Sequence, residues 1–293
     1  MTRRAGRTAV SRAFIVPALV VMTVFIVVPA IVGVVLSFSD WKGFGALNWV
    51  GLQNYLKFFT DPQSLQSLAN TAILAIMIVV GQNLAGLGLA LILERRRPGG
   101  AFLQALFLMP VIISPVIISY LWQYIYSPFG ALNVVLDAVG LDALERSWLG
   151  DPHTALAAIA VTIVWQQTGT SMVIYLAGLR GIPPELTEAA QIDGAAWWHR
   201  LTRIKLPLLA PAITINLVLT LIAGLRVFDQ IIAMTGGGPG YATDTLSTVI
   251  YKRGFGAGQL SYGLTMAIVL SVAITVLAVV QTVLLRRREE AMR

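Results

Sequence analysis

Uncharged apolar runs long enough to cross a lipid bilayer recur along this sequence. They occupy 14–38, 71–93, 102–126 and 155–179. Each is at least as long as the roughly 20 residues that a helix needs to span the hydrocarbon core. A backbone inside the bilayer must satisfy its own hydrogen bonds, and a run of this length does so as a helix. The pattern predicts an all-α, polytopic membrane protein.

Two further apolar runs, 208–234 and 262–285, raise the predicted number of transmembrane helices to six. Composition agrees, because 57% of the 293 residues are hydrophobic, only 12% are charged, and the mean hydropathy is +0.77. The chain has no cysteine and two histidines, which excludes a disulfide framework and disfavours a metal centre. We therefore expect no metal site.

The ends of the chain are basic. The segment 1–13 resembles the start of a secretory signal, but the apolar run behind it is long enough to span, so we predict an uncleaved first helix. The segment 286–293 is predicted to be a second basic tail. Pro110 and Pro115 lie inside the third run and predict a kink or a break there.

Lysine and arginine are distributed unequally between the two predicted sides of the membrane. The side that carries both termini, the turn at 94–100 and the connection 180–207 holds 15 of them, and the opposite side holds 5. Arg226, inside the fifth run, completes the 21. The positive-inside rule then predicts that both termini and the connection 180–207 are cytoplasmic. The net charge of +7 follows from topology and does not indicate a nucleic-acid surface.

The connection 180–207 carries seven charged residues and a histidine between two long apolar runs, so we expect it to lie outside the bilayer. Pro183 and Pro184 suit the entrance of a helix, because proline lacks the amide proton that a first turn cannot use. Asp193 and Gly194 predict a joint, since glycine tolerates backbone angles denied to other residues. Two short helices on either side of that joint are expected, exposed to a soluble partner.

The same connection carries an ordered set of residues: Glu188, Ala189, Ala190, Asp193, Gly194, Ala195, Ile204, Leu206, Pro207 and Pro211. This set resembles the EAA loop of permease subunits of binding-protein-dependent ABC importers. Leu201 departs from the family, which commonly has phenylalanine there. An ordinary solvated amphipathic loop is the alternative.

The resemblance implies the type I permease fold, with a six-helix domain at 14–285 and the EAA coupling loop at 180–207. It assigns ATPase coupling to Glu188, Ala189, Ala190, Asp193, Gly194, Ala195, Leu206 and Pro207. It also implies the partners: a second, related permease, two ATPase subunits and an extracytoplasmic solute-binding protein, around a multi-pass subunit of the cytoplasmic (inner) membrane.

A second set of residues resembles permeases for carbohydrates, of the group of the larger maltose-transporter permease and the glycerol-phosphate permease. Its members are Phe228, Asp229, Met234, Thr235, Gly236, Gly237, Gly238, Pro239, Thr243, Thr245, Leu246, Ile250 and Tyr251. The resemblance implies a sugar or sugar-like solute. It leaves open whether that solute is an oligosaccharide, a sugar derivative or a glycerol-phosphate compound, and whether this subunit or its partner holds it.

Candidate residues for the solute pathway are polar or aromatic side chains within predicted spans: Trp165, Gln166, Asn216, Arg226, Phe228 and Asp229. On a continuous fifth helix, Arg226 and Asp229 would share one face, where they could pair with each other instead. Most amides at this depth bond between helices, so packing is the default role of Gln166 and Asn216.

The sequence contains no phosphate-binding loop and no catalytic grouping of side chains, so we do not expect an enzyme. No cofactor is expected on this chain, and ATP with Mg²⁺ is expected on the partner ATPases. A secondary transporter driven by an ion gradient is the alternative function, and a membrane-bound enzyme is a more distant one.

Overall fold

The structure is a computed structural model that describes residues 15–94 and 98–291. The described residues are mostly helical and contain no strand, and one isolated antiparallel bridge joins Ser39 to Trp49. Contacts divide the chain into two units, one made of 1–58 with 250–268 and the other of 59–249 with 269–293. The predicted N-terminal tail 1–13 and the arginines at 95–97 lie outside the described residues.

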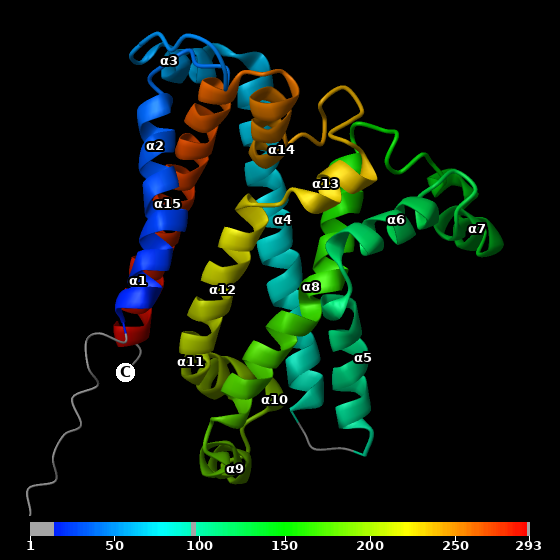
Figure 1. Ribbon diagram of the computed structural model, residues 1–293. Helices are drawn as coiled ribbons and strands as arrows, with labels where there is room; N and C mark the ends of the chain where they lie inside the picture. The colour runs from blue at the N-terminus through cyan, green and yellow to red at the C-terminus, as the bar shows by residue number, and fades with distance from the viewer. Residues whose placement is uncertain (1–14, 95–97, 292–293) are drawn as a thin grey trace, which may run out of the picture. The chain divides into compact units, whose positions relative to one another are not determined.

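The first unit opens with an apolar rod, Val16–Leu36. Its parts are α1 Val16–Met22, the π-helical turn η2 Thr23–Val27 and α2 Val28–Leu36 (Figure 1). Pro29 cannot donate a backbone hydrogen bond, which accounts for the wider turn directly before it. None of the three parts contains a buried residue, as expected for a helix whose surface faces lipid.

Polar side chains close the end of this unit that follows α2. Ser39 Oγ lies 3.0 Å from Ser261 Oγ, near the start of α15 Leu260–Ala291. Asp40 accepts hydrogen bonds from the side chain and the backbone of Asn48, and these bonds lower the pKa of the Asp40 carboxyl. The first unit also contains η5 Lys252–Gly256 and most of α3 Gln53–Thr60, and most of α14 Leu246–Tyr251 belongs to the second unit.

The second unit holds the other helices. They are α4 Pro62–Leu93, α5 Gly100–Ile112, α6 Pro115–Ile125, α7 Ala131–Ala138, η3 Asp142–Leu144, α8 Ala155–Arg180, α9 Pro184–Ile192, α10 Trp197–Arg200, η4 Leu201–Lys205, α11 Leu206–Leu208, α12 Ala210–Leu225 and α13 Asp229–Met234. Helix α4 packs against both α8 and α12. Glycine allows the close approach, because a Cβ on Gly86 would lie 2.5 Å from Ser171 Cβ of α8.

Within residues 15–94 and 98–291, four helices are long and apolar enough to cross a membrane, or up to six if each of two bent pairs counts as one span. Helices α5 and α6 form the first bent pair, with 98° between them at Pro115, so the predicted break in the third span is confirmed (Figure 1). The second pair joins the segment Trp197–Leu208 to α12 at 70°.

The predicted fifth span, 208–234, is wrong as a continuous helix. Helix α12 ends at Leu225 and α13 begins at Asp229. Thr245 Oγ1 donates to the Val227 carbonyl at 3.0 Å, which satisfies a polar group that the break exposes. Arg226 and Asp229 therefore do not share one helical face.

Candidate functional site

Helix α9 lies beyond the ends of α4, α8 and α12, at the bottom of Figure 1. It starts at Pro184, with Pro183 as its N-cap and Glu185 in its first turn. Proline at the first position and a carboxylate near the positive end of the helix both favour a helix start here. The predicted pair of short helices is confirmed, because α10 begins at Trp197 after a break.

Gly194 forms the joint between α9 and α10. Its φ of +76° lies in the left-handed region, and its N–H donates to the Gln191 carbonyl at 3.1 Å. The N–H of Ala195 donates to the Ala190 carbonyl at 2.9 Å. This pair of bonds is the Schellman arrangement, in which a left-handed glycine ends a helix. A Cβ on Gly194 would meet nothing within 4 Å, so the surface over the joint is open.

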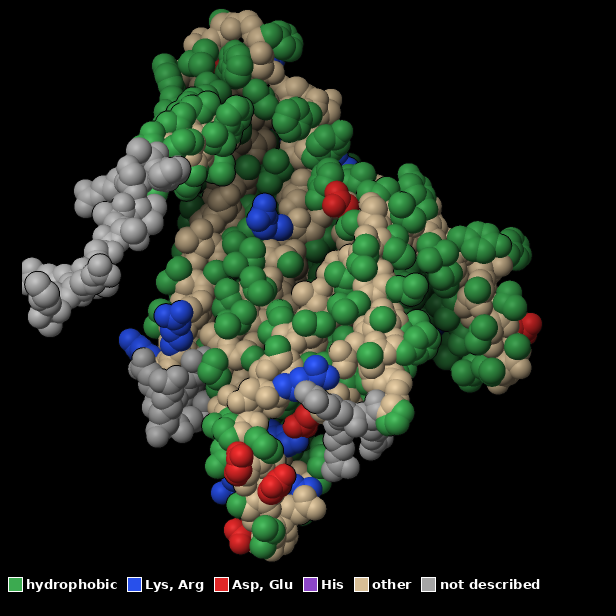
Figure 2. Space-filling view, turned by 60° about the horizontal axis from the view of Figure 1, so that its bottom comes forward, with side chains coloured by type: hydrophobic (Ala, Val, Ile, Leu, Met, Phe, Trp, Pro, Cys, Tyr) green, Lys and Arg blue, Asp and Glu red, His purple; other side chains and the backbone are tan. Residues whose placement is uncertain are grey.

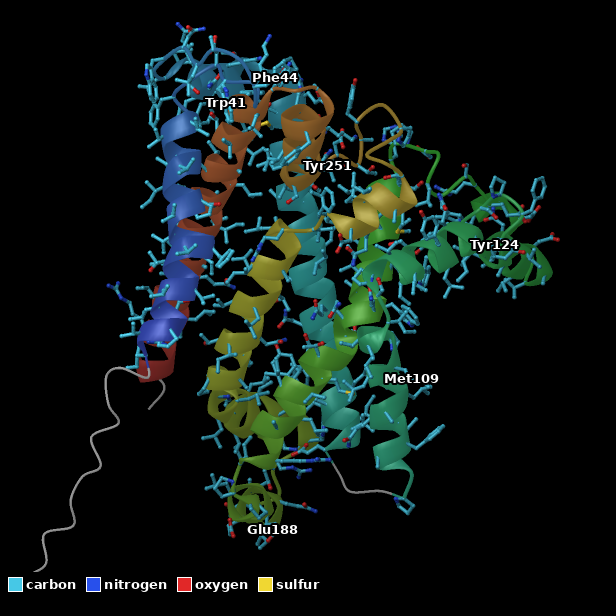
Figure 3. The ribbon with its side chains drawn as sticks, viewed as in Figure 1. Trp41, Phe44, Met109, Tyr124, Glu188 and Tyr251 are labelled. Carbon is cyan, nitrogen blue, oxygen red and sulfur yellow. The ribbon has the colours of Figure 1, made fainter. Side chains whose placement is uncertain are left out.

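The predicted coupling residues Glu188, Ala189, Asp193 and Gly194 are exposed, and Ala190, Ala195, Leu206 and Pro207 are half-buried. In Figure 3, Glu188 points away from the helices above it. Large apolar side chains share this surface: Ile192 is 87% exposed and Trp198 64%. Acidic and basic side chains gather at the same end of the second unit in Figure 2. Such a mixed apolar and charged surface suits a protein partner.

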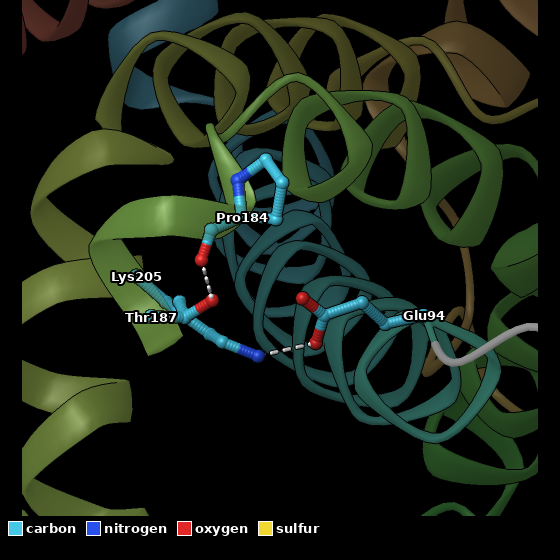
Figure 4. Close-up of polar contacts among 4 residues, drawn as sticks. All are labelled: Glu94, Pro184, Thr187 and Lys205. Carbon is cyan, nitrogen blue, oxygen red and sulfur yellow. Dashed lines mark hydrogen bonds and ion pairs between the residues drawn. The ribbon is translucent and has the colours of Figure 1, made fainter. Parts of the chain in front are cut away.

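A pocket of about 630 Å³ opens beside α9. Its lining includes Thr187, Gln191, Trp197, Glu94 and Lys205. Thr187 Oγ1 donates to the Pro184 carbonyl at 2.8 Å, and Lys205 Nζ lies 2.5 Å from Glu94 Oε2 (Figure 4). The pocket separates α9 and α10 from the end of α4.

Asn216 does not face open space. Its side-chain nitrogen donates to Asn83 Oδ1 at 2.8 Å, and its oxygen accepts from Ser171 at 3.2 Å. Tyr175 donates to the same Asn83 oxygen, and Asn83 donates to Thr220 Oγ1 at 2.9 Å. This set of side chains, which we call the amide layer, joins α4, α8 and α12 within the apolar interior.

Gln166 is also buried. It donates to the Ile113 carbonyl at 2.9 Å, at the break between α5 and α6, and its oxygen lies 3.4 Å from the side-chain nitrogen of Gln230. Trp165 is 43% exposed and contacts Trp122 edge-on. It lines an apolar groove of about 620 Å³ between α4, α5 and α8. Of these two neighbours, Trp165 has a surface available to a ligand.

Arg226, Phe228 and Asp229 lie together at the break between α12 and α13. Both charged side chains are exposed and Phe228 is half-buried. Among the described residues, no salt bridge joins Arg226 to Asp229. The alternative role, a mutual ion pair, is therefore not formed in this structure, which leaves both charges available to a solute or to another chain.

Residues 2–290 match the family described as "Binding-protein-dependent transport system inner membrane component". The chain belongs to this family. The permease is 36% identical over 272 residues to the probable ABC transporter permease protein YurN of Bacillus subtilis, with 92% of this chain and 93% of the relative covered. It is 36% identical over 271 residues to the trehalose/maltose transport system permease protein MalF of Thermococcus litoralis, with 90% and 91% covered.

A solved structure is similar over nearly the whole permease. It is a bacterial alginate ABC transporter in complex with an alginate pentasaccharide-bound periplasmic protein. The similarity has a TM-score of 0.83 and 27% identity, and it covers 94% of each chain. The all-α permease fold expected from the sequence is confirmed.

Sequence reasoning missed the contact between Glu94 and Lys205, although both residues belong to segments recognised as polar. The sequence places Glu94 at the end of the second predicted span, directly before three arginines. Its partner lies 111 residues later in the chain, and no local pattern signals such a pairing.

Proposed function

We propose that this permease forms half of the pathway of an ATP-driven importer for a carbohydrate solute. Its docking segment, defined as residues 184–207, receives an ATPase subunit on the cytoplasmic side. The observation that carries this proposal is the open Gly194 joint on a helix that projects beyond the membrane helices. The described residues leave the surface over this joint open, so a separate chain can cover it.

The energy for transport comes from partner subunits in this proposal. ATP and Mg²⁺ bind two ATPases, one on this permease and one on a second, related permease, and this chain binds neither. An extracytoplasmic solute-binding protein delivers the solute. The family's description as a binding-protein-dependent system supports that partner, as does the periplasmic protein in the alginate transporter structure.

Docking of a cytoplasmic ATPase on 184–207 fixes the orientation of the permease. Both termini are then cytoplasmic, in agreement with the excess of lysine and arginine predicted for that side. The coupling contacts fall to Glu188, Ala189, Ala190, Asp193, Gly194, Ala195, Leu206 and Pro207. Of these, Gly194 forms the left-handed joint and Glu188 and Asp193 supply exposed charge.

The solute is a sugar or a sugar derivative. Two similar proteins support this class, one named for trehalose and maltose and one for the polysaccharide alginate. Arg226, Phe228 and Asp229 are the strongest pathway candidates, since two exposed charges beside an aromatic ring suit hydroxyl groups and a sugar face. Trp165 remains a candidate, while the buried amides of Gln166 and Asn216 are engaged between helices.

An ion-gradient-driven secondary transporter is the alternative. Such a protein needs a carboxylate in the membrane for its coupling ion, and Asp229 is the one acidic residue within the predicted spans. That function gives no role to the exposed docking segment.

Hydrolysis of ATP by the complex in vesicles separates these functions. The permease is co-expressed with its partner subunits, reconstituted, and supplied with the binding protein and a panel of sugars that includes maltose and trehalose. The proposal predicts that a sugar accelerates ATP hydrolysis and enters the vesicles. Uptake that follows an imposed proton or sodium gradient, without ATP, would support the secondary transporter.

A further inference from the structure

One side-chain contact ties the docking segment to the membrane helices. Lys205 at the end of η4 places Nζ 2.5 Å from Oε2 of Glu94, the residue after α4 (Figure 4). The other side-chain hydrogen bonds from this segment go to its own carbonyls, with Thr187, Arg200 and Thr202 as donors. Within the part of the chain that the structure describes, no second side-chain hydrogen bond or salt bridge leaves residues 184–205.

Apolar packing does little to fix this segment. Helices α9 and α10 contain no buried residue, and Leu201 is the buried residue that η4 contributes. The pocket of about 630 Å³ lies where a packed core would otherwise join α9 to α4. Few buried side chains therefore hold α9 and α10 against the rest of the second unit.

The two charges are well placed to act as an anchor. The side chain of Lys205 is 17% exposed and that of Glu94 is 23% exposed. Salt screens a sheltered pair less than a surface pair, and loss of one partner leaves the other charge poorly solvated. Glu94 follows α4, whose Asn83 is bonded to α8 and α12 in the amide layer, so the anchor point is itself fixed.

We infer that the Glu94–Lys205 ion pair is a positioning contact that fixes the docking segment to the end of α4. The consequence for transport rests on the proposed function, because the fixed segment is the one that the ATPase binds. Without the pair, α9 samples several directions, and the ATPase must then order the segment as it binds. Lys205 and Glu94 act through the segment and need not touch the ATPase or the solute.

The absence of native cysteine allows this inference to be tested by spin labels on two introduced cysteines. Glu185→Cys on α9 and Leu84→Cys on α4 place labels at exposed positions. In the purified permease, the distance distribution between the labels should be narrow. Lys205→Glu and Glu94→Lys should each broaden the distance distribution. The variant that combines both substitutions should have a narrow distribution again, and Lys205→Arg, which keeps the positive charge, should leave the distribution narrow.

Arg203→Glu is the matched control, because Arg203 is exposed in the same turn and makes no salt bridge among the described residues. It changes the charge as Lys205→Glu does, and the distribution should stay narrow. In the full complex, each broken pair should weaken ATPase binding about tenfold, with recovery in the charge exchange. An unaltered distribution in Lys205→Glu, or failure of the exchange to restore it, would overturn the inference.

The label distances are measured on the permease alone, so they remain informative if no ATPase binds. Complete absence of ATPase binding to the unmodified permease would contradict the proposed function instead. The two failures are therefore distinguishable.

Discussion

The side-chain nitrogen of Asn216 on α12 donates to Oδ1 of Asn83 on α4 at 2.8 Å. The hydroxyl of Tyr175 on α8 donates to the same oxygen, so three helices share one acceptor. All three side chains are buried. A solute could reach this oxygen only if the helices separated, which assigns the amide layer to helix association rather than to ligand contact in this conformation.

Removal of one hydroxyl from the amide layer should destabilise the permease. Thr220 Oγ1 accepts from Asn83 and donates to the Asn216 carbonyl at 2.8 Å. In Thr220→Val we expect the free energy of unfolding in detergent to fall by about 0.5–2 kcal/mol, since a buried donor loses its partner. Thr275→Val is the control, because exposed Thr275 bonds only to a carbonyl of its own helix; its effect should stay below about 0.5 kcal/mol. Equal losses in the two variants would contradict this role of the layer.

The contact between α4 and α8 should tolerate no added methyl at Gly86. A Cβ there would lie 3.0 Å from the backbone nitrogen of Met172 as well as 2.5 Å from Ser171 Cβ. We expect Gly86→Ala to lower the free energy of unfolding by about 1–3 kcal/mol through overpacking. Gly88→Ala lies on the same helix and meets nothing within 4 Å, so thermal unfolding of that variant should match the unmodified permease. A stable Gly86→Ala variant would show that α4 and α8 can separate freely.

Arg226 and Asp229 should affect transport independently of each other. Because they form no salt bridge, exchanging the two charges should not restore what Arg226→Asp or Asp229→Arg removes. We expect at least about a tenfold loss of sugar-stimulated ATP hydrolysis in each single variant, while the ATPase remains bound. Full recovery in the exchanged variant would indicate a structural ion pair that forms in another state of the transporter.

The sequence predicts those features whose causes are local. The limits of α8 follow from one uncharged run, and the joint at Gly194 follows from the need for a left-handed residue. The end of α12 cannot be predicted from local sequence. The Val227 carbonyl beyond it accepts a hydrogen bond from Thr245, which lies 18 residues later. The burial of Gln166 and Asn216 likewise depends on partners from other helices. Periodicity and residue type identify polar groups at membrane depth but not what they face.

The docking segment offers a sharp test because Gly194 combines a left-handed backbone, which glycine adopts without strain, with an open surface. Its φ of +76° disfavours most side chains, yet the permease leaves room for one. Gly45, in the first unit, is a close match, with a φ of +80° and nothing within 4 Å of an added Cβ. Tryptophan at either position introduces similar backbone strain. A difference in ATPase retention between the two variants therefore shows that the ATPase needs the surface at Gly194.

The central claim is that the Gly194 surface binds the ATPase that drives transport. Purified membrane complexes of Gly194→Trp and Gly45→Trp are compared for the amount of ATPase retained and for sugar uptake in vesicles. We predict that Gly194→Trp inserts in the membrane but loses the ATPase or uncouples hydrolysis from uptake, while Gly45→Trp retains both. Gly194→Asn, which tolerates the left-handed backbone, should retain more ATPase than Gly194→Trp. Normal ATPase retention together with normal uptake in Gly194→Trp would contradict the account.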